Sequence, residues 1–453
     1  MRKVILSFSL LMTALTCGAQ ETELKLDTIH YAGDSNIYTD IVFLGDGFTD
    51  EEMQVFVDFA KAQSEHFFEK MPWSAYKEMF NVFYVKTPSN ESGAGKTPDE
   101  PIDNYYGTCF GTSGVDRMPW PTKWASVYGV LNQVKPNYDM VAIVVNSEKY
   151  GGGGGGSFIC FSLNEHSIET LRHEAGHAFG HLADEYWYRG YEAPNMTSIT
   201  DPVKWENWMG YNDVGFYCYY ENEGDDANSK NWYRPHQNCQ MRYLYSEYCP
   251  VCMEALIERI HETSRNIVSY TPKNEEATNI YDKSQVFMLK LLKPNPNTLR
   301  VDWQIDGKTV AHNKERLTIN AGQLPDGDHT LTVIVEDTTL LVRTNDHTTL
   351  HASVLAWDII AKTPLGIKAV GATGNDFTIG PLPFTTELCY NAKESTNEDV
   401  RMELWDTDGH CAASATAHGS QCSIATGKLP KGVYVLRIYS GVRQVYCRQV
   451  TKH

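Results

Sequence analysis

The sequence predicts an α/β domain followed by two β-sandwich modules, and a change of hydrophobic pattern supports this interpretation. Between about residues 38 and 265, short apolar runs alternate with segments whose apolar residues recur at helical spacing. Beyond about residue 270 the period falls to two, and turn residues separate short alternating runs. We therefore expect an α/β domain at 38–265, one sandwich at 266–365 and another at 366–453.

The first 19 residues have the form of a secretory signal peptide. Two basic residues precede a short apolar run, and small residues follow up to Ala19. The run is too short to span a bilayer, and no other run in the chain reaches that length. We expect cleavage after Ala19, with 20–37 as a short N-terminal segment of a secreted, periplasmic or cell-surface protein. Lipidation at Cys17 is the alternative.

The charge of the 453-residue chain argues against two classes of partner. There are 39 Lys and Arg against 57 Asp and Glu, a formal net charge of −18, so nucleic acid and anionic membrane surfaces are unfavourable partners. Loss of Cys17 would leave ten of the 11 cysteines, and an even number in an exported chain predicts disulfides. The alternative is a structural zinc bound by Cys239, Cys249 and Cys252 with Cys218.

The elements of the α/β domain can be assigned in order. Thr49 and Glu52 have the spacing of a capping box, which predicts the start of a helix that continues to residue 68. Helical spacing of apolar residues predicts a second helix at 162–180. Continuous apolar runs predict buried strands at 38–47, 81–87 and 140–147.

Six glycines at 151–156 separate the last of these strands from the second helix. Each glycine loses maximal backbone entropy on folding, so we do not expect a strand interior here. The run is interpreted as a flexible loop, or as a mobile rim where backbone without side chains can approach a peptide closely.

Two related stretches mark the β-sandwich modules. Both "LPDGDHTLTVIVED" and "LPKGVYVLRIYSG" place Leu-Pro-x-Gly before an alternating run. This pattern is typical of a turn that leads into a half-buried strand, so we expect one such strand in each module.

The segment "TLRHEAGHAFGHLADEYW" carries the candidate metal site. His173 and His177 are four residues apart, so a helix places both imidazoles on one face, where they can bind one Zn²⁺ ion. Glu174 follows the first histidine and is placed to act as general base towards a metal-activated water. This H-E-x-x-H arrangement predicts hydrolysis without a covalent intermediate.

The third zinc ligand must come from outside this helix. The metzincin pattern H-E-x-x-H-x-x-G-x-x-H has its glycine at Gly180, but Ala183 occupies the last ligand position. Ligands spaced by four along a straight helix rise too far to surround one ion, so we expect Gly180 to supply a bend. We predict Asp184 as the third ligand, and the alternatives are Glu185, His181 and, on a later helix, Glu254.

The stretch "NCQMRYLY" fits the same site. Met241 resembles the methionine turn that lies beneath the metal in metzincins, although core packing is the alternative role for a single methionine. Tyr243 stands two places further on, and we expect it to donate to the developing oxyanion, with Arg242 as the alternative donor.

Four stretches carry a family resemblance: "IVFLGDGFTDEE", "NSEKYGGGGGG", "HEAGHAFGHLADEY" and "NCQMRYLYSEYCPVC". Together, over about residues 38–262, they resemble the M64 peptidases, a family that includes an immunoglobulin-A-cleaving metallopeptidase. The resemblance implies a zinc endopeptidase of metzincin-like α/β fold. It also implies that His173, His177 and a carboxylate of the "DEY" segment are ligands and that Glu174 is the base. It does not imply cleavage of immunoglobulin by this chain.

The C-terminal module carries a second resemblance. Its stretch "LPKGVYVLRI" is similar to the core of C-terminal sorting domains of the type IX secretion system, which implies passage across an outer membrane. Cys411 and Cys422 depart from the usual pattern. An ordinary accessory sandwich is the alternative.

These observations predict a secreted zinc-dependent endopeptidase that acts on host or dietary protein. One alternative is a peptidase-fold protein that binds surface or glycoprotein ligands, although a site that only binds has no need of Glu174. Another is a zinc amidase that acts on a non-peptide bond, although an open, glycine-rimmed cleft favours an extended peptide.

Overall fold

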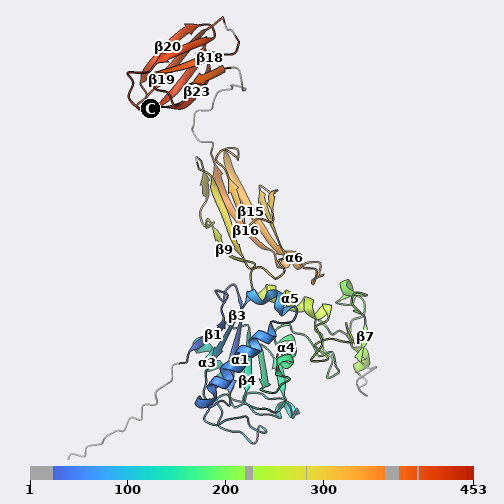
Figure 1. Cartoon of the computed structure of the whole chain (residues 1–453). Helices are drawn as coiled ribbons and strands as arrows, with labels where there is room; N and C mark the ends of the chain where they lie inside the picture. The colour runs from blue at the N-terminus through green and yellow to red at the C-terminus, as the bar shows by residue number, and fades with distance from the viewer. Residues whose placement is uncertain (1–23, 220–227, 282, 363–376, 395–396) are drawn as a thin grey trace, which may run out of the picture. The chain divides into compact units, whose positions relative to one another are not determined.

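The computed structural model describes residues 24–219, 228–281, 283–362, 377–394 and 397–453 (Figure 1). The chain divides into two compact units. The first comprises Met1–Thr278, Val286–Thr318 and His329–Ile359, and the second comprises Asn279–Gln285, Ile319–Asp328 and Ile360–His453. The expected signal peptide at 1–19 and the expected module boundary after residue 365 lie outside the described residues.

A six-stranded sheet forms the centre of the α/β domain. Its strands are β1 (Leu26–His30), β2 (Thr39–Asp46), β3 (Phe80–Val85), β4 (Met140–Val145), β5 (Gly152–Gly155) and β6 (Phe158–Ser162), in the order β1-β3-β2-β4-β6-β5. The four inner strands run parallel, and one antiparallel strand lies at each edge. Every residue of the inner strands is buried, as expected of a parallel sheet covered on both faces.

Helices cover both faces of this sheet. They are α1 (Met53–Phe67), α2 (Trp73–Tyr76), α3 (Trp124–Val134), α4 (Ser167–Ala178) and α5 (Pro250–Thr263). Short 3-10 turns lie at Asp50–Glu52, Lys77–Met79, Thr112–Gly114, Glu206–Trp208 and Ser229–Asn231, and a small ribbon is formed by β7 (Tyr217–Cys218) and β8 (Tyr233–Arg234). The predicted capping box before α1 is confirmed, because Thr49 N donates to Glu52 Oε2 at 3.0 Å. Within the described ranges, no helix is long and apolar enough to cross a membrane.

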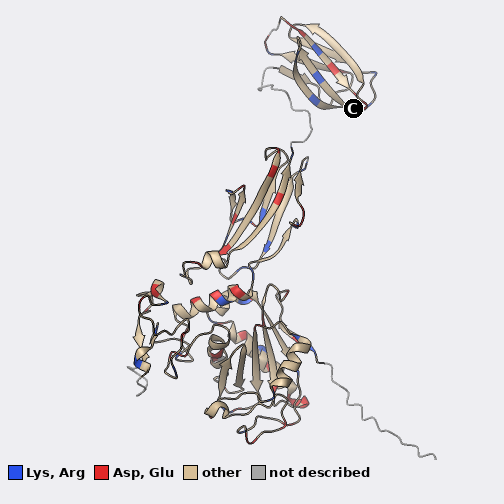
Figure 2. Cartoon of the chain, turned by 180° about the vertical axis from the view of Figure 1, so that it is seen from behind, with Lys and Arg blue, Asp and Glu red and all other residues tan. Residues whose placement is uncertain are grey.

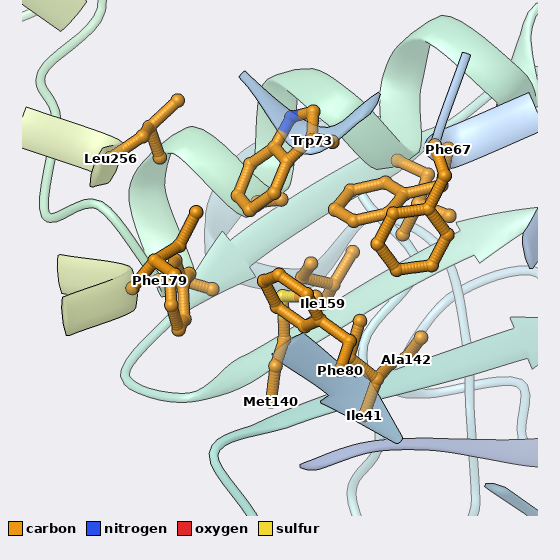
Figure 3. Close-up of a cluster of buried hydrophobic side chains, with 14 of the residues drawn as sticks. Ile41, Phe67, Trp73, Phe80, Met140, Ala142, Ile159, Phe179 and Leu256 are labelled. Carbon is orange, nitrogen blue, oxygen red and sulfur yellow. The ribbon is translucent and has the colours of Figure 1, made fainter. Parts of the chain in front are cut away.

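The main core lies between one face of the sheet and α1, α2, α4 and α5 (Figure 3). Trp73, Phe80 and Phe179 pack together there, with ring centroids 5.7 to 6.1 Å apart. Met140 of β4 and Leu256 of α5 are buried in the same cluster. A second cluster joins the opposite face to α3. The three layers therefore fix α4, the helix of the H-E-x-x-H motif, against the sheet.

Both edge strands differ from the sequence prediction. β1 pairs with β3, so the sheet includes a strand that the expected domain start near residue 38 leaves out. The glycine run, expected to be a loop or mobile rim, forms β5 and pairs with β6. A Cβ on Gly152 would lie 2.2 Å from Thr170 Cγ2 of α4. The strand therefore uses glycine because the helix packs directly on its backbone, and this packing outweighs the entropic cost.

A β-sandwich follows α5, as predicted. One sheet contains β16 (Ser353–Ala361), β15 (Gly327–Asp337), β12 (Leu299–Ile305) and β13 (Lys308–His312) as neighbours, and the other has the order β14 (Arg316–Ile319), β11 (Gln285–Leu291) and β9 (Ile267–Thr271). A short helix, α6 (His347–Leu350), precedes β16, and β10 (Thr278–Ile280) lies where the chain passes between the two units. Trp357 of the first sheet packs on Phe287 of the second, with ring centroids 5.3 Å apart.

The second unit contains another sandwich. Its sheets have the orders β17 (Phe377–Gly380), β18 (Glu387–Ala392), β21 (Gln421–Ala425), and β20 (Cys411–His418), β19 (Asp399–Trp405), β22 (Gly432–Ser440), β23 (Arg443–Lys452). Leu388 and Ile424 of one sheet and Met402 and Leu436 of the other share one buried cluster. Burial alternates along β19 and β22, which confirms the period of two.

Candidate metal centre

α4 carries the H-E-x-x-H motif on a face that is shielded from solvent. The side chains of His173 and His177 are 8% and 17% exposed. Their ring centroids lie 4.9 Å apart at an interplanar angle of 86°. The four-residue spacing therefore places both imidazoles on one helix face, as expected.

Asp184 brings a third donor to these imidazoles. After α4 the chain turns back, and Asp184 Oδ1 lies 3.1 Å from Nε2 of both His173 and His177. The donor atoms of the three side chains all lie within 4.8 Å of one another. Among the alternative ligands, His181 is exposed in the turn, and Glu185 is buried in a separate group.

The turn after α4 differs in detail from the expected one. The helix ends at Ala178, and the residue with a left-handed backbone is His181, with φ 54°, instead of Gly180. Glycine at 180 has a different function, because a Cβ there would lie 2.5 Å from Leu256 Cδ2 of α5. Gly180 thus permits close packing of α5, and His181 supplies the bend.

Main-chain hydrogen bonds orient both imidazoles. His173 Nδ1 lies 3.0 Å from Gln240 O, and His177 Nδ1 lies 2.7 Å from Leu182 O. A carbonyl oxygen only accepts, so each Nδ1 carries a proton and Nε2 is directed towards Asp184. An imidazole held in this way presents the Nε2 lone pair that a metal needs.

The three side chains are also coupled electrostatically. Burial lowers the pKa of His177, but the hydrogen bond to Asp184 and the charge of Asp184 prevail and raise it to about 9. Burial raises the pKa of Asp184, but hydrogen bonds from His173 and His177 hold it below its usual range. The Asp184 carboxylate thus stabilises a positive charge between the three side chains. That charge can be a proton on an imidazole or a divalent cation bound by the three donors.

Met241 lies beneath the motif helix, where the sequence predicts a methionine turn. It is fully buried, and a Cβ on Gly176 would lie 2.4 Å from its Sδ. The carbonyl oxygen of Met241 accepts from Glu185 N at 2.8 Å. The methionine segment therefore supports both the helix and the segment that carries Asp184.

Glu174 packs against the glycine strand β5. It is 7% exposed, and a Cβ on Gly154 would lie 2.9 Å from its Oε2. Gly154 and Gly155 also line a cavity of about 380 Å³, together with His177 and Asp184. The backbone of β5 therefore contacts Glu174 and forms one wall of the space beside the three donors.

The position of Tyr243 gives its predicted role no support. Tyr243 is 50% exposed, and its ring lies 4.9 Å from the guanidinium of Arg242, the alternative donor. Neither residue lies in the three-donor group or along the cavity wall.

Tyr186 is a tyrosine beside the group that the sequence pattern does not indicate, whereas Tyr188 and Tyr191 line the cavity with His177 and Asp184. The Tyr186 ring is nearly parallel to that of His173, with centroids 6.4 Å apart. Burial raises the pKa of Tyr186, and the charges of Asp184 and Glu174 raise it further. Its hydroxyl therefore stays protonated and able to donate. The only signal in the sequence is its place two residues after Asp184.

A second group of donor atoms lies beside the first. Cys239, Cys249, Cys252 and Glu185 are buried, and their donor atoms lie within 4.8 Å of one another. All ten cysteines within the described ranges are free, so the predicted disulfides are absent. Cys218 does not join this group, because its thiol faces main-chain oxygens of the 229–230 turn.

A model of one protein family, described as IgA Peptidase M64, matches residues 28–214. The match covers less than half of the chain. It includes the H-E-x-x-H motif and Asp184, and it ends before Cys239 and Met241. The match suggests a metallopeptidase, and hence a protein or peptide substrate. No curated protein matches the chain.

The solved structures similar to this chain include several β-rich modules. The fibronectin(III)-like modules of Clostridium thermocellum CbhA are 19% identical, over 22% of this chain and 99% of theirs, with a TM-score of 0.15. Bacteroides ovatus SGBP-B, of a mixed-linkage glucan utilization locus, is 13% identical. The match covers 41% of this chain and 47% of that protein, with a TM-score of 0.16. Carbohydrate-binding modules of the β-sandwich superfamily are 10% identical. The match covers 41% of this chain and 89% of theirs, with a TM-score of 0.15. Because these scores are low, the sandwiches of this chain are assigned from its own sheets.

Proposed function

We propose that the α/β domain is a secreted, zinc-dependent endopeptidase that hydrolyses peptide bonds of extracellular protein. The observation that carries the proposal is the convergence of His173, His177 and Asp184, with Glu174 on the same helix. Two imidazole nitrogens and a carboxylate oxygen are a ligand set that catalytic zinc uses, and three protein ligands leave a fourth position for substrate or water. The family match supports the same assignment.

Zinc bound by these residues would polarise the scissile carbonyl and activate water at neutral pH. Glu174 accepts a proton from the attacking water and delivers it to the leaving amine. Contact with Gly154 restricts the orientation of the Glu174 carboxylate. The Tyr186 hydroxyl, in place of Tyr243, donates to the oxyanion that develops on the carbonyl.

The substrate would lie as an added strand along β5. β5 is the last strand of its sheet, and Gly154 and Gly155 line the cavity beside His177 and Asp184. An extended peptide binds an edge strand through main-chain hydrogen bonds, which the middle of a chain provides as well as an end does. We therefore propose internal cleavage, with sequence preference set by a few side-chain pockets.

Two other functions use the same fold. A protein that only binds glycoprotein or surface ligands would not need Glu174 beside the three donors. A zinc amidase acting on a non-peptide bond would use the same residues and differ in its substrate. The sorting role of 366–453 concerns location, not chemistry, and stays a prediction.

The test is incubation of the mature chain, residues 20–453, with a mixed library of peptides, glycan-linked amides and glycoproteins, read by mass spectrometry. We expect internal cleavages that a chelator abolishes and added zinc restores. Cleavage of a glycan-linked amide, with all peptides intact, would favour the amidase. Zinc-loaded protein that retains glycoprotein without cleaving any substrate would favour the binding protein. Cleavage that is indifferent to the chelator would contradict the proposal.

A further inference from the structure

We propose that Cys239, Cys249, Cys252 and Glu185 bind a second, structural zinc ion. The four residues come from three separate segments. Glu185 follows the turn after α4, Cys239 precedes Met241, and the two remaining cysteines lie at the start of α5. Three thiolates and one carboxylate are donors that zinc accepts, and four protein ligands complete a closed tetrahedral site.

The distances between the donor atoms fit one tetrahedral ion. With Zn–S bonds of about 2.3 Å, two sulfurs of a tetrahedron lie about 3.8 Å apart, and a sulfur and an oxygen about 3.5 Å. Cys239 Sγ and Cys252 Sγ are 3.7 Å apart. Glu185 Oε1 lies 3.2 Å from Cys252 Sγ and 3.7 Å from Cys249 Sγ. The side chains are therefore already arranged at ligand spacing.

The burial of Glu185 gives an independent reason for a cation. Glu185 is fully buried, and its Oε2 accepts no hydrogen bond from any residue that the structure describes. Its other oxygen, Oε1, accepts from Asn195 Nδ2 at 3.3 Å. A buried carboxylate with an unsatisfied oxygen is costly unless a positive charge compensates it. A zinc ion among the three thiolates would supply that charge.

A buried arginine reduces the negative charge that one zinc ion would leave. Three thiolates and a carboxylate would exceed the charge of one zinc ion by two. Arg234 is fully buried, and its Nη1 donates to the main-chain oxygen of Glu185 at 2.8 Å. This guanidinium therefore offsets part of the remaining negative charge.

A disulfide explains the group less well. The 3.7 Å between Cys239 Sγ and Cys252 Sγ is well beyond a bond of about 2.05 Å. A bridge between any two of the three cysteines would also leave the third thiol and Glu185 buried without a cation. One metal ion satisfies all four donors at once.

The second ion would brace the first site. Glu185 is adjacent to Asp184, and Cys239 is adjacent to Gln240, whose carbonyl oxygen orients His173. A zinc ion here ties both segments to the start of α5. Binding of this ion does not depend on the proposed function, whereas its effect on hydrolysis does.

The test compares zinc per chain in the purified mature protein and three variants. We expect about two zinc ions in the wild type and in Cys218→Ser, whose thiol lies outside the group, and about one in Cys249→Ser. His177→Ala should lose the other ion. Loss of zinc only in Cys249→Ser would support this inference while contradicting the proposed function. Loss only in His177→Ala would overturn this inference.

Cobalt substitution of the wild-type protein decides the question even if Cys249→Ser fails to fold. A cobalt ion bound by thiolates gives strong charge-transfer absorption in the near ultraviolet, whereas one bound by imidazoles and a carboxylate does not. We expect this absorption. Its absence, or a disulfide among residues 239, 249 and 252 found by mass spectrometry without reduction, would overturn the proposal.

Discussion

Asp184 and Glu185 are adjacent carboxylates that belong to different groups of donor atoms. Asp184 meets His173 and His177, whereas Glu185 meets three cysteines. One step along the chain therefore separates a candidate catalytic metal centre from a candidate structural one. The separation makes the two groups testable by single substitutions.

Replacing Asp184 with alanine should weaken zinc binding at the first site by about 100-fold or more. Loss of an outer-shell partner alone costs about 10- to 100-fold in metal affinity, and removal of a ligand should cost at least as much. Competition with a chelator of known affinity measures the change. His181→Asn is the control, since asparagine tolerates the left-handed backbone and removes the competing imidazole. If His181→Asn released the metal and Asp184→Ala kept it, the ligand assignment would be wrong.

Gly154→Ala should reduce kcat by about 10- to 100-fold while zinc stays bound, because its methyl group would displace Glu174, the proposed general base. The added Cβ would lie 2.9 Å from Glu174 Oε2. Gly129→Ala on α3 is a control away from the cavity, because no atom of the described residues would lie within 4 Å of its added Cβ. Steady-state kinetics on one peptide compares the two. Equal activity of both variants would show that β5 does not position Glu174.

At this scale, the sequence alone predicts residues whose relation is local. His173, Glu174 and His177 follow from helical spacing, and Asp184 from its place after the bend. The position of Tyr186 beside His173 depends on long-range packing, which periodicity does not reveal. The same holds for the contacts of Glu185 with cysteines more than 50 positions away. The same limit applies to Tyr243, whose predicted role depends on its nearness in sequence to Met241.

Among the elements, α5 carries an acidic row formed by Glu254, Glu258 and Glu262, with Arg259 beside it (Figure 2). Glu254, considered from sequence as a zinc ligand, instead accepts from the backbone N–H groups of Arg343 and Thr344. One turn further on, Glu258 pairs with His347 and His351, one imidazole on each carboxylate oxygen. α5 therefore joins the α/β domain to the segment around α6 by buried polar contacts.

The contact of Glu258 with the two histidines predicts a pH-dependent stability. Burial raises the pKa of Glu258, but hydrogen bonds from His347 and His351 prevail and lower it from 4.5 to about 2. This contribution is present above pH 4.5 and lost as pH falls towards 2. Burial lowers the pKa of His347, but Glu258 raises it above 6.5. That contribution is present below pH 6.5 and lost as pH rises through the raised pKa.

Glu258→Gln should therefore lower the free energy of unfolding most between pH 4.5 and 6.5, by about 3 kcal/mol. The difference from the wild type should shrink well above the raised pKa of His347. Urea unfolding at about pH 5.5 and about pH 9.5 measures it. Glu262→Gln is the control on the same helix, because the ion pair of Glu262 with Arg259 is partly exposed. An equal loss at both pH values would contradict this account.

The elements themselves were largely predictable. The capping box, the buried parallel strands and the alternating strands of both sandwiches follow from local pattern. β5 does not follow from local pattern, because a run of glycines has no side chains that could show a periodicity. The close packing of α4 on its backbone explains why glycine occupies this strand. β1 is not indicated by the sequence, because its five residues, LDTIH, form no continuous apolar run, and none of them is fully buried.

At the scale of the whole molecule, the order of an α/β domain and two sandwiches follows from the change of hydrophobic period. The expected boundaries stay predictions where they fall outside the described residues. Among the described residues, two groups of donor atoms lie in the α/β domain, and Glu174, the proposed general base, lies on the helix of the first group. Hydrolysis by the chain should therefore depend on one carboxylate.

The most direct test of this account is the rate of peptide hydrolysis by the mature chain carrying Glu174→Ala, at a zinc content matched to the wild type. We predict a fall of about 1,000-fold or more with zinc retained, because the substitution removes the proposed general base and leaves the proposed ligands in place. Glu165→Ala, an exposed glutamate just before α4, should keep wild-type activity. Hydrolysis at the wild-type rate by the zinc-loaded Glu174→Ala variant would contradict the account.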